Sequence, residues 1–387
     1  MRILACLTIV PLIAACGRLG FNDTAVTDAA GPADAPLADR LACGKPAQFT
    51  VPATTARIAA TRTAKGYAMF AVDDTGALHG QAYDFSGGTL AAHGAGGSLA
   101  INATGPLGVA AVGNGVMLVV PTGRPAATGT QLLALDALLA PTGNAAPTAG
   151  WYGGPGALAV SSLGAIAALG TLDNREVDVK LVSPLGADLG AFHPAVDKAD
   201  LATQPTIVSS GGGYLVAWSA NAASPNEVRA EVLDAQLGIV QQPVTISQPL
   251  GDAFLPRVAY AAAQNTYLFA WTQKIGGNDV IGLSLRDGKL ATLPGDAANF
   301  TPPGGSPSVV AGDADFLVVW QDDALASRLG AARITANGEI TSLIIKGSGG
   351  KAVSWDLVVR NGQPALVWLE AGATVNTVNV WIDPLCG

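Results

Sequence analysis

The sequence predicts an all-β protein built from repeats, and three observations lead to this fold class. The chain of 387 residues contains 48 Gly and 24 Pro, while only 13% of its residues are charged. Surface helices need charged residues on their exposed side, so this composition argues against a mainly helical fold. The other two observations are a short apolar run that ends in tryptophan and a proline ahead of an aliphatic residue. Both recur at a nearly constant spacing.

The apolar runs give the length of the repeat. Four runs end in Trp218, Trp271, Trp320 and Trp368, at spacings of 53, 49 and 48 residues. Steps of 49 residues back from Trp218 reach three further apolar runs of the same length, at 165–169, 116–120 and 67–71. A fixed period of this size is typical of repeat architectures, so the runs indicate seven copies of one unit.

The prolines keep the same period independently. They are Pro106, Pro155, Pro205, Pro256 and Pro307, at spacings of 49, 50, 51 and 51. Each apolar run is followed by a polar loop and by a segment in which apolar and polar residues alternate, for example 228–233, and then by a further short segment such as 243–246. Alternation at period two is typical of a half-buried strand. One unit is therefore expected to hold four short strands in about 49 residues.

Four-stranded units repeated around an axis resemble the blades of a β-propeller. Residues 43–387 number 345, which divided by seven gives about 49 residues for each unit. The resemblance implies a seven-bladed propeller with the apolar runs in inner strands and the alternating segments outside them. It implies no subfamily, because the WD and sialidase signatures are missing and a kelch-like Gly-Gly pair occurs only at 211–212.

The two ends of the repeat region predict how the ring closes. The last copy ends after its third strand, 378–382, while residues 43–51 stand ahead of the first inner strand, where a fourth strand belongs. We expect the N-terminal strand to complete the last blade.

The first sixteen residues predict where the protein is located. A basic start, Met1-Arg2, precedes an apolar stretch at 3–15, which is too short to span a bilayer. The stretch ends in Ile13-Ala14-Ala15-Cys16, which resembles the lipobox of bacterial lipoproteins. The resemblance implies a signal peptide over residues 1–15 and a lipid on Cys16, and Gly17 fits sorting to the outer membrane. The alternative is a plain secretory signal with an incidental cysteine.

The segment after the lipobox and the remaining cysteines complete this organisation. Residues 16–42 are rich in Ala, Asp and Pro and are expected to form a disordered tether after the lipidated cysteine. Cys6 would leave with the signal peptide, so Cys43 and Cys386 remain, and they flank the predicted join of the ring. We expect a disulfide between them, which the chain-entropy model values at about 4–5 kcal/mol for so long a loop. A metal site is the alternative, but no further Cys or His lies near either residue in the sequence.

Charge and loop composition narrow the function. A net charge of −8, from 21 basic and 29 acidic residues, argues against nucleic-acid binding. The loops between second and third strands are polar and should open on one face of the disc, where binding residues on a rigid scaffold concentrate. The candidate binding face consists of Asp73, Asp74, Asp173, Arg175, Asn226, Gln273, Asp279, Asp322, Asp323 and Glu370. The alternative is that these side chains form an ordinary solvated rim.

Other chemistries have little support in the sequence. The four aligned tryptophans could stack on sugars, but their place at the end of buried runs favours packing between blades. No Asp-x-Asp-x-Asp loop occurs, so no metal is expected, and no motif suggests a cofactor. The only histidines, His79, His93 and His193, occupy three different positions of the repeat without a Ser or Cys motif beside them.

Three functions therefore remain. The leading hypothesis is a lipid-anchored module, expected to be a monomer, that binds or scaffolds a protein or a glycan of the cell envelope. The alternatives are a propeller enzyme that acts on envelope or extracellular glycans and a purely structural surface protein. Two charged residues from different blades that converge at the channel mouth would favour the enzyme. A wide polar face without such convergence would favour binding.

Overall fold

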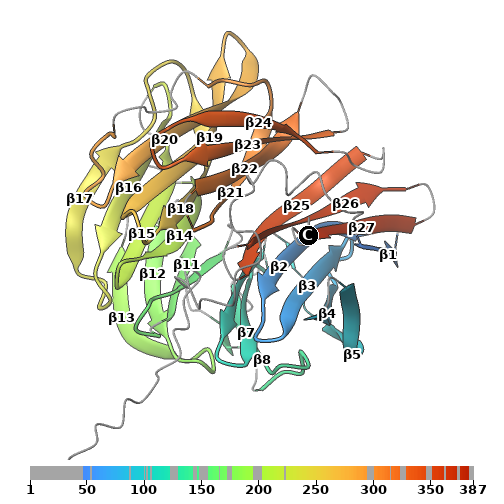
Figure 1. Ribbon diagram of the computed structural model, residues 1–387. Helices are drawn as coiled ribbons and strands as arrows, with labels where there is room; N and C mark the ends of the chain where they lie inside the picture. The colour runs from blue at the N-terminus through green and yellow to red at the C-terminus, as the bar shows by residue number, and fades with distance from the viewer. Residues whose placement is uncertain are drawn as a thin grey trace, which may run out of the picture.

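The computed structural model shows a β-propeller whose strands form seven blades around a central axis (Figure 1). No helix occurs within the described part of the chain. The described residues are 47–52, 55–86, 89–99, 101, 103–104, 107–122, 130–142, 146–147, 156–164, 166–171, 177–194, 203–221, 224–293, 300–313, 315–322, 328–345, 351–360, 363–372 and 375–382. The predicted fold class and number of blades are confirmed.

Each of the first three blades is a four-stranded antiparallel sheet with its strands in chain order. Blade 1 consists of β2 (Thr55–Arg62), β3 (Gly66–Asp73), β4 (Leu78–Ser86) and β5 (Thr89–Leu99). Blade 2 consists of β6 (Gly108–Val112), β7 (Gly115–Val120), β8 (Gln131–Leu135) and β9 (Ala146–Pro147). Blade 3 consists of β10 (Ala157–Val160), β11 (Ile166–Thr171), β12 (Val177–Val182) and β13 (Asp188–Pro194).

The other four blades follow the same order, with two local differences. Blade 4 consists of β14 (Thr203–Ser210), β15 (Gly213–Ala220), β16 (Glu227–Leu233) and β17 (Ile239–Thr245). Blade 5 has three strands among the described residues, namely β18 (Ala253–Ala261), β19 (Thr266–Ile275) and β20 (Asn278–Asp287). Blade 6 consists of β21 (Gly305–Ala311), β22 (Asp315–Asp322), β23 (Arg328–Thr335) and β24 (Ile340–Ile344). Blade 7 combines β25 (Lys351–Arg360), β26 (Gln363–Ala371) and β27 (Val375–Ile382) with β1 (Ala47–Pro52).

The inner strands make the ring continuous. In chain order, each of β2, β6, β10, β14, β18, β21 and β25 contacts the next, and β25 contacts β2. The N-terminal strand β1 pairs antiparallel with β27, from Ala47 opposite Val380 to Pro52 opposite Val375. Gln48 Nε2 also donates a hydrogen bond of 2.7 Å to Oδ1 of the buried Asn379. That this pairing holds the ring closed stays a prediction.

The core lies between the blades, because the second strand of each blade is buried on both faces. All eight residues of β15 are buried, including Trp218 with 0% of its surface exposed. Trp218 packs against Ala167 and Val177 of blade 3, and Trp271 packs in the same way against Leu215 of blade 4. The aligned tryptophans are therefore core residues between blades, as their sequence positions predicted.

The repeated prolines mark a bulge in the inner strand. The pairing register shifts between β14 and β15, between β18 and β19, and between β21 and β22, each time at the marker proline. The residue before the proline has a positive φ in all three blades, namely 53° at Gln204, 55° at Leu255 and 52° at Ser306. Proline fits a bulge because it has no N–H to contribute to the ladder. The bulge therefore explains the second repeat marker.

A second recurring device lies in the turn between third and fourth strands. In blade 2, Asp136 Oδ1 accepts hydrogen bonds from the backbone N–H groups of Leu138, at 2.8 Å, and Ala140, at 2.9 Å. Leu139 in this turn has φ 63° but is only 5% exposed and packs into the core with Leu135. The left-handed conformation costs about 1–2 kcal/mol, which burial of a leucine, at about 1.5–3 kcal/mol, offsets. Blades 4 and 5 repeat the turn with Leu237 and Leu290.

A candidate binding site in the central channel

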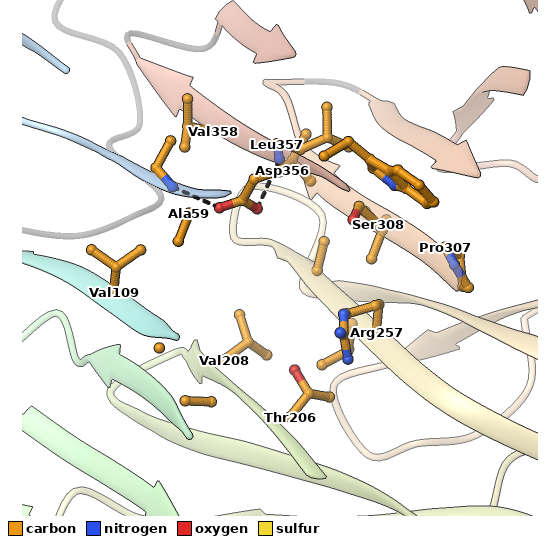
Figure 2. Close-up of a pocket in the computed structure, with 18 of the residues that line it drawn as sticks. Ala59, Val109, Thr206, Val208, Arg257, Pro307, Ser308, Asp356, Leu357 and Val358 are labelled. Carbon is orange, nitrogen blue, oxygen red and sulfur yellow. Dashed lines mark hydrogen bonds between the residues drawn. The ribbon is translucent and has the colours of Figure 1, made fainter. Parts of the chain in front are cut away.

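The inner strands of all seven blades line one cavity of about 640 Å³ on the axis of the ring. Volumes of about 300–1,000 Å³ are usual for small-molecule sites. Figure 2 shows this cavity with strands from several blades around it. Four polar side chains from consecutive blades lie on its wall, and the strand register places them at equivalent positions.

Each of the four pairs with the residue just before the aligned tryptophan of its blade. Thr206 lies opposite Ala217, Arg257 opposite Ala270, Ser308 opposite Val319 and Asp356 opposite Val367. All four line the cavity and are partly buried. We call this set the polar arc; it comes from blades 4 to 7.

The same position in blades 1 to 3 carries apolar residues. Ala59 pairs with Phe70, Gly108 with Val119 and Leu158 with Ala168, and all three of Ala59, Gly108 and Leu158 line the cavity. We call these three residues the apolar arc. At this register position the channel therefore has one polar side and one aliphatic side, which is the combination that orients a small ligand. Arg57 of β2 also lines the cavity, at a different position of its strand.

Arg257 and Asp356 are the two charged members of the polar arc, and burial works against the charge of each. Burial lowers the pKa of the Arg257 guanidinium, and the nearby Asp356 opposes that effect. Burial raises the pKa of Asp356 from 3.8 to about 6, against the hydrogen bonds that its carboxylate accepts and the charge of Arg257. Figure 2 shows both side chains beside the same space. None of the ion pairs between described residues joins them.

The carboxylate of Asp356 is held by the strand of the next blade. Its Oδ2 accepts a hydrogen bond of 2.9 Å from Ala60 N in β2, and its Oδ1 accepts one of 2.9 Å from Leu357 N. Two residues earlier, Ser354 Oγ accepts a hydrogen bond of 3.1 Å from Ile58 N in β2. Asp356 and Ser354 therefore join the last blade to the first along the channel.

The predicted binding-face residues lie where second strands end and third strands begin, but several have structural partners. Gln273 is 3% exposed and its Oε1 accepts a 2.7 Å hydrogen bond from Trp271 Nε1. Glu370 is 6% exposed and accepts the corresponding bond from Trp368 Nε1, at 2.8 Å. Asp73 accepts hydrogen bonds from Thr75 and Ala77 within its own turn. These three carboxylate and amide groups stabilise the fold.

The remaining members of that face are spread over different blades. The backbone N–H of Asn226 donates to Asp252 Oδ1 at 2.9 Å, and the backbone carbonyl of Asp279 accepts from Gly304 N at 3.0 Å. Asp74 is exposed in the β3–β4 turn, and Asp322 ends β22. Asp173, Arg175, Asp323, Cys43 and Cys386 lie outside the described residues, as does the segment 1–42 with Cys16.

The histidines also lie apart, and no metal cluster occurs in the described ranges. His79 Nε2 lies 3.5 Å from Asp73 Oδ2, and His93 Nδ1 lies 2.9 Å from Asp84 Oδ2. His193 lies in β13, opposite Val179. The described residues contain no group of three or more His, Cys, Asp and Glu that could hold a metal ion. They also contain no helix long and apolar enough to cross a membrane.

The two charged residues of the polar arc were not predicted from the sequence, although one of them had a signal. Arg257 follows Pro256 directly, as Thr206 follows Pro205 and Ser308 follows Pro307. A charge at this repeat position stands out once the prolines are aligned. Asp356 follows Trp355 instead, so only the register with Trp368 brings it to the same position.

Comparisons with known proteins support the fold alone. No family model and no curated protein matches the sequence. Among solved structures, the chain is similar to the Dos1 propeller, with a TM-score of 0.50 and 11% identity over 87% of this chain and 95% of that chain. It is also similar to a streptogramin B lyase, with a TM-score of 0.48 and 10% identity over 87% of this chain and 97% of that one.

Proposed function

We propose that the protein is a lipid-anchored binding module of the cell envelope and that its ligand site is the central channel. The observation that carries the proposal is the division of the channel wall into a polar arc and an apolar arc. The hydrogen bonds of Asp356 join blade 7 to blade 1, but ring closure does not account for Arg257, and removing a charge from water is costly. The lipobox Ile13-Ala14-Ala15-Cys16 supports the anchor, because it resembles the processing site of lipoproteins.

The binding of a small ligand fits the channel better than the binding of a protein surface. The predicted polar face loses Gln273 and Glu370 to internal hydrogen bonds with tryptophans. Protein interfaces bury about 800 Å² on each partner, which calls for a broad surface and not a channel on the axis. A glycan fragment or another small envelope molecule is therefore the ligand class that we propose. The protein itself is proposed to be a monomer with the lipid as its only membrane attachment.

One observation favours the alternative of an enzyme. A carboxyl group with its pKa raised to about 6, such as Asp356, is suited to general acid catalysis. However, both oxygens of Asp356 already accept backbone hydrogen bonds, and Arg257 comes from two blades away without an ion pair to it. We therefore place binding ahead of catalysis on glycans.

Native mass spectrometry tests the channel site. The full-length protein, extracted from membranes in detergent, is expected to carry a small molecule that Ser308→Trp displaces, because indole would fill the channel. Leu138→Trp is the matched control, since Leu138 is 56% exposed in a turn of blade 2. An identical bound molecule in both variants, or none in the native protein, would contradict a channel ligand.

The anchor has its own test. Cys16→Ala should block labelling with lipid precursors and release the protein from the membrane fraction. Unchanged membrane association of the variant would rule out the lipoprotein proposal.

A further inference from the structure

Arg257 is partly buried on the channel wall and lacks a counter-charge bonded to it. Its guanidinium carries five N–H donors, and the hydrogen bond found for it is from Nη1 to the backbone carbonyl of Pro256, at 3.0 Å. No ion pair among the described residues neutralises it. Because withdrawing a charge from water without a partner is costly, the channel favours an occupant that brings a negative charge.

Asp356 does not fill this role. Its two oxygens accept the hydrogen bonds from Ala60 N and Leu357 N, which tie blade 7 to blade 1. It acts on Arg257 only through space. It also limits the charge of an incoming group, because a dianion would be repelled by the carboxylate more strongly than a monoanion.

Hydroxyl groups flank Arg257 on both sides of the polar arc. Thr206 precedes it in blade 4 and Ser308 follows it in blade 6, at the same register position. Neither hydroxyl has a hydrogen-bond partner among the described residues, and Figure 2 shows both side chains beside the cavity. A guanidinium between two free hydroxyls offers donors to an oxyanion from three consecutive blades.

We infer that Arg257, with Thr206 and Ser308, binds the carboxylate of a small organic acid whose apolar part lies against Ala59, Gly108 and Leu158. This inference rests on the proposed function, because it assumes that the channel is the ligand site. A carboxylate matches the planar fork of a guanidinium with two parallel hydrogen bonds. Its single charge matches that of Arg257, whereas the carboxylate of Asp356 repels a phosphate dianion more strongly.

The inference predicts a preference of acids over their amides. The probes are phenylacetate and hexanoate, each paired with its neutral primary amide, and inorganic phosphate. Calorimetric titration into the full-length protein in detergent should show both acids binding at least about tenfold more tightly than their amides, since a hydrogen-bonded charge pair is worth more than about 1.4 kcal/mol. Phosphate should bind more weakly than either acid.

Variants assign the preference to Arg257. Arg257→Gln should bind acid and amide equally, and Arg257→Lys should keep part of the preference because it keeps the charge but not the fork. Lys289→Gln is the matched control, since it removes the same charge from an exposed turn of blade 5 and should leave the preference intact. Circular dichroism checks that each variant is folded.

The outcomes separate this inference from the proposed function. Amides that bind as tightly as acids, a preference that survives Arg257→Gln, phosphate binding tighter than both acids, or no binding of either acid would overturn the carboxylate site. If the native protein carries a neutral molecule that Ser308→Trp displaces, the channel is a ligand site as proposed, but it is not a carboxylate site. If the native protein carries no channel ligand at all, both the proposed function and the carboxylate site are refuted.

Discussion

Blades 4 to 7 and blades 1 to 3 share one strand order but differ in the residues at two repeat positions. The end of the second strand carries Trp218, Trp271, Trp320 and Trp368 in the first group, and Ala71, Val120 and Leu169 in the second. The equivalent channel position carries the polar arc in the first group and the apolar arc in the second.

This difference between the two groups of blades shows which residues the fold requires and which residues the channel site requires. A buried second strand at a regular period suffices to build a blade, because Met117, Leu118 and Val119 of blade 2 are as fully buried as Leu215 and Val216 of blade 4. The ring forms equally from either kind of blade. The chemistry of the channel, in contrast, depends on one residue in each inner strand, so a function is added to the fold at single positions.

The largest expected effect tests the seam between blade 7 and blade 1, which is one of the two places where the two groups of blades meet. If Cys43 and Cys386 form a disulfide, Cys43→Ala should lower the melting temperature strongly, since a bridge over so long a loop is worth about 4–5 kcal/mol in the chain-entropy model. Blade structure at low temperature should persist in circular dichroism. Titration of free thiols in the denatured, non-reduced mature protein checks the bridge directly, and two reactive thiols per chain would refute it.

The next effect tests the tryptophan position itself. Trp218→Ala should lower the free energy of unfolding by about 3–5 kcal/mol, because it leaves a cavity between blades 3 and 4. Urea denaturation measures it. Leu163→Ala in blade 3 serves as the control and should change stability by less than about 0.5 kcal/mol, since its side chain is 75% exposed.

Much of this fold follows from the sequence because it depends on period and burial. The apolar runs predict the second strands, and the prolines predict the inner strands. The turns with a buried left-handed leucine could not be foreseen, because Leu139 adopts that φ only where its side chain meets the core shared with the preceding blade. The channel site was missed for a similar reason: Asp356 contacts Ala60, 296 residues away in the chain.

A smaller effect tests how tightly the tryptophan blades are packed. Gly282 in β20 lies opposite Trp271, and a Cβ at this position would lie 2.4 Å from Cε2 of the indole ring. Gly282→Ala should therefore destabilise the protein by about 1–3 kcal/mol in urea denaturation. Gly97→Ala in blade 1 is the matched control, because a Cβ there has no atom within 4 Å. Equal effects of the two substitutions would show that the tryptophan blades are not the tighter ones.

The smallest effect concerns the charged residue that joins blade 7 to blade 1. The pKa of Asp356 in the folded protein is raised from 3.8 to about 6 by burial, so the folded state holds this proton more tightly than the unfolded state does. The stability that Asp356 contributes through its proton is fully present below about pH 3.8 and is lost as the pH rises through about 6. Asp356→Asn cannot titrate, so the melting temperature of the native protein minus that of the variant should fall by about 1–3 °C between pH 4 and pH 7.5.

The control for this titration is the neighbouring contact of the same seam. Ser354→Ala removes the hydrogen bond between Ile58 N and Ser354 Oγ but no ionisable group. Its difference from the native protein should therefore stay constant over the same pH range. A constant difference for Asp356→Asn as well would mean that the carboxylate does not occupy the partly buried position in which it accepts backbone hydrogen bonds between blades 7 and 1. The argument that Asp356 disfavours a dianionic channel ligand would then also be wrong.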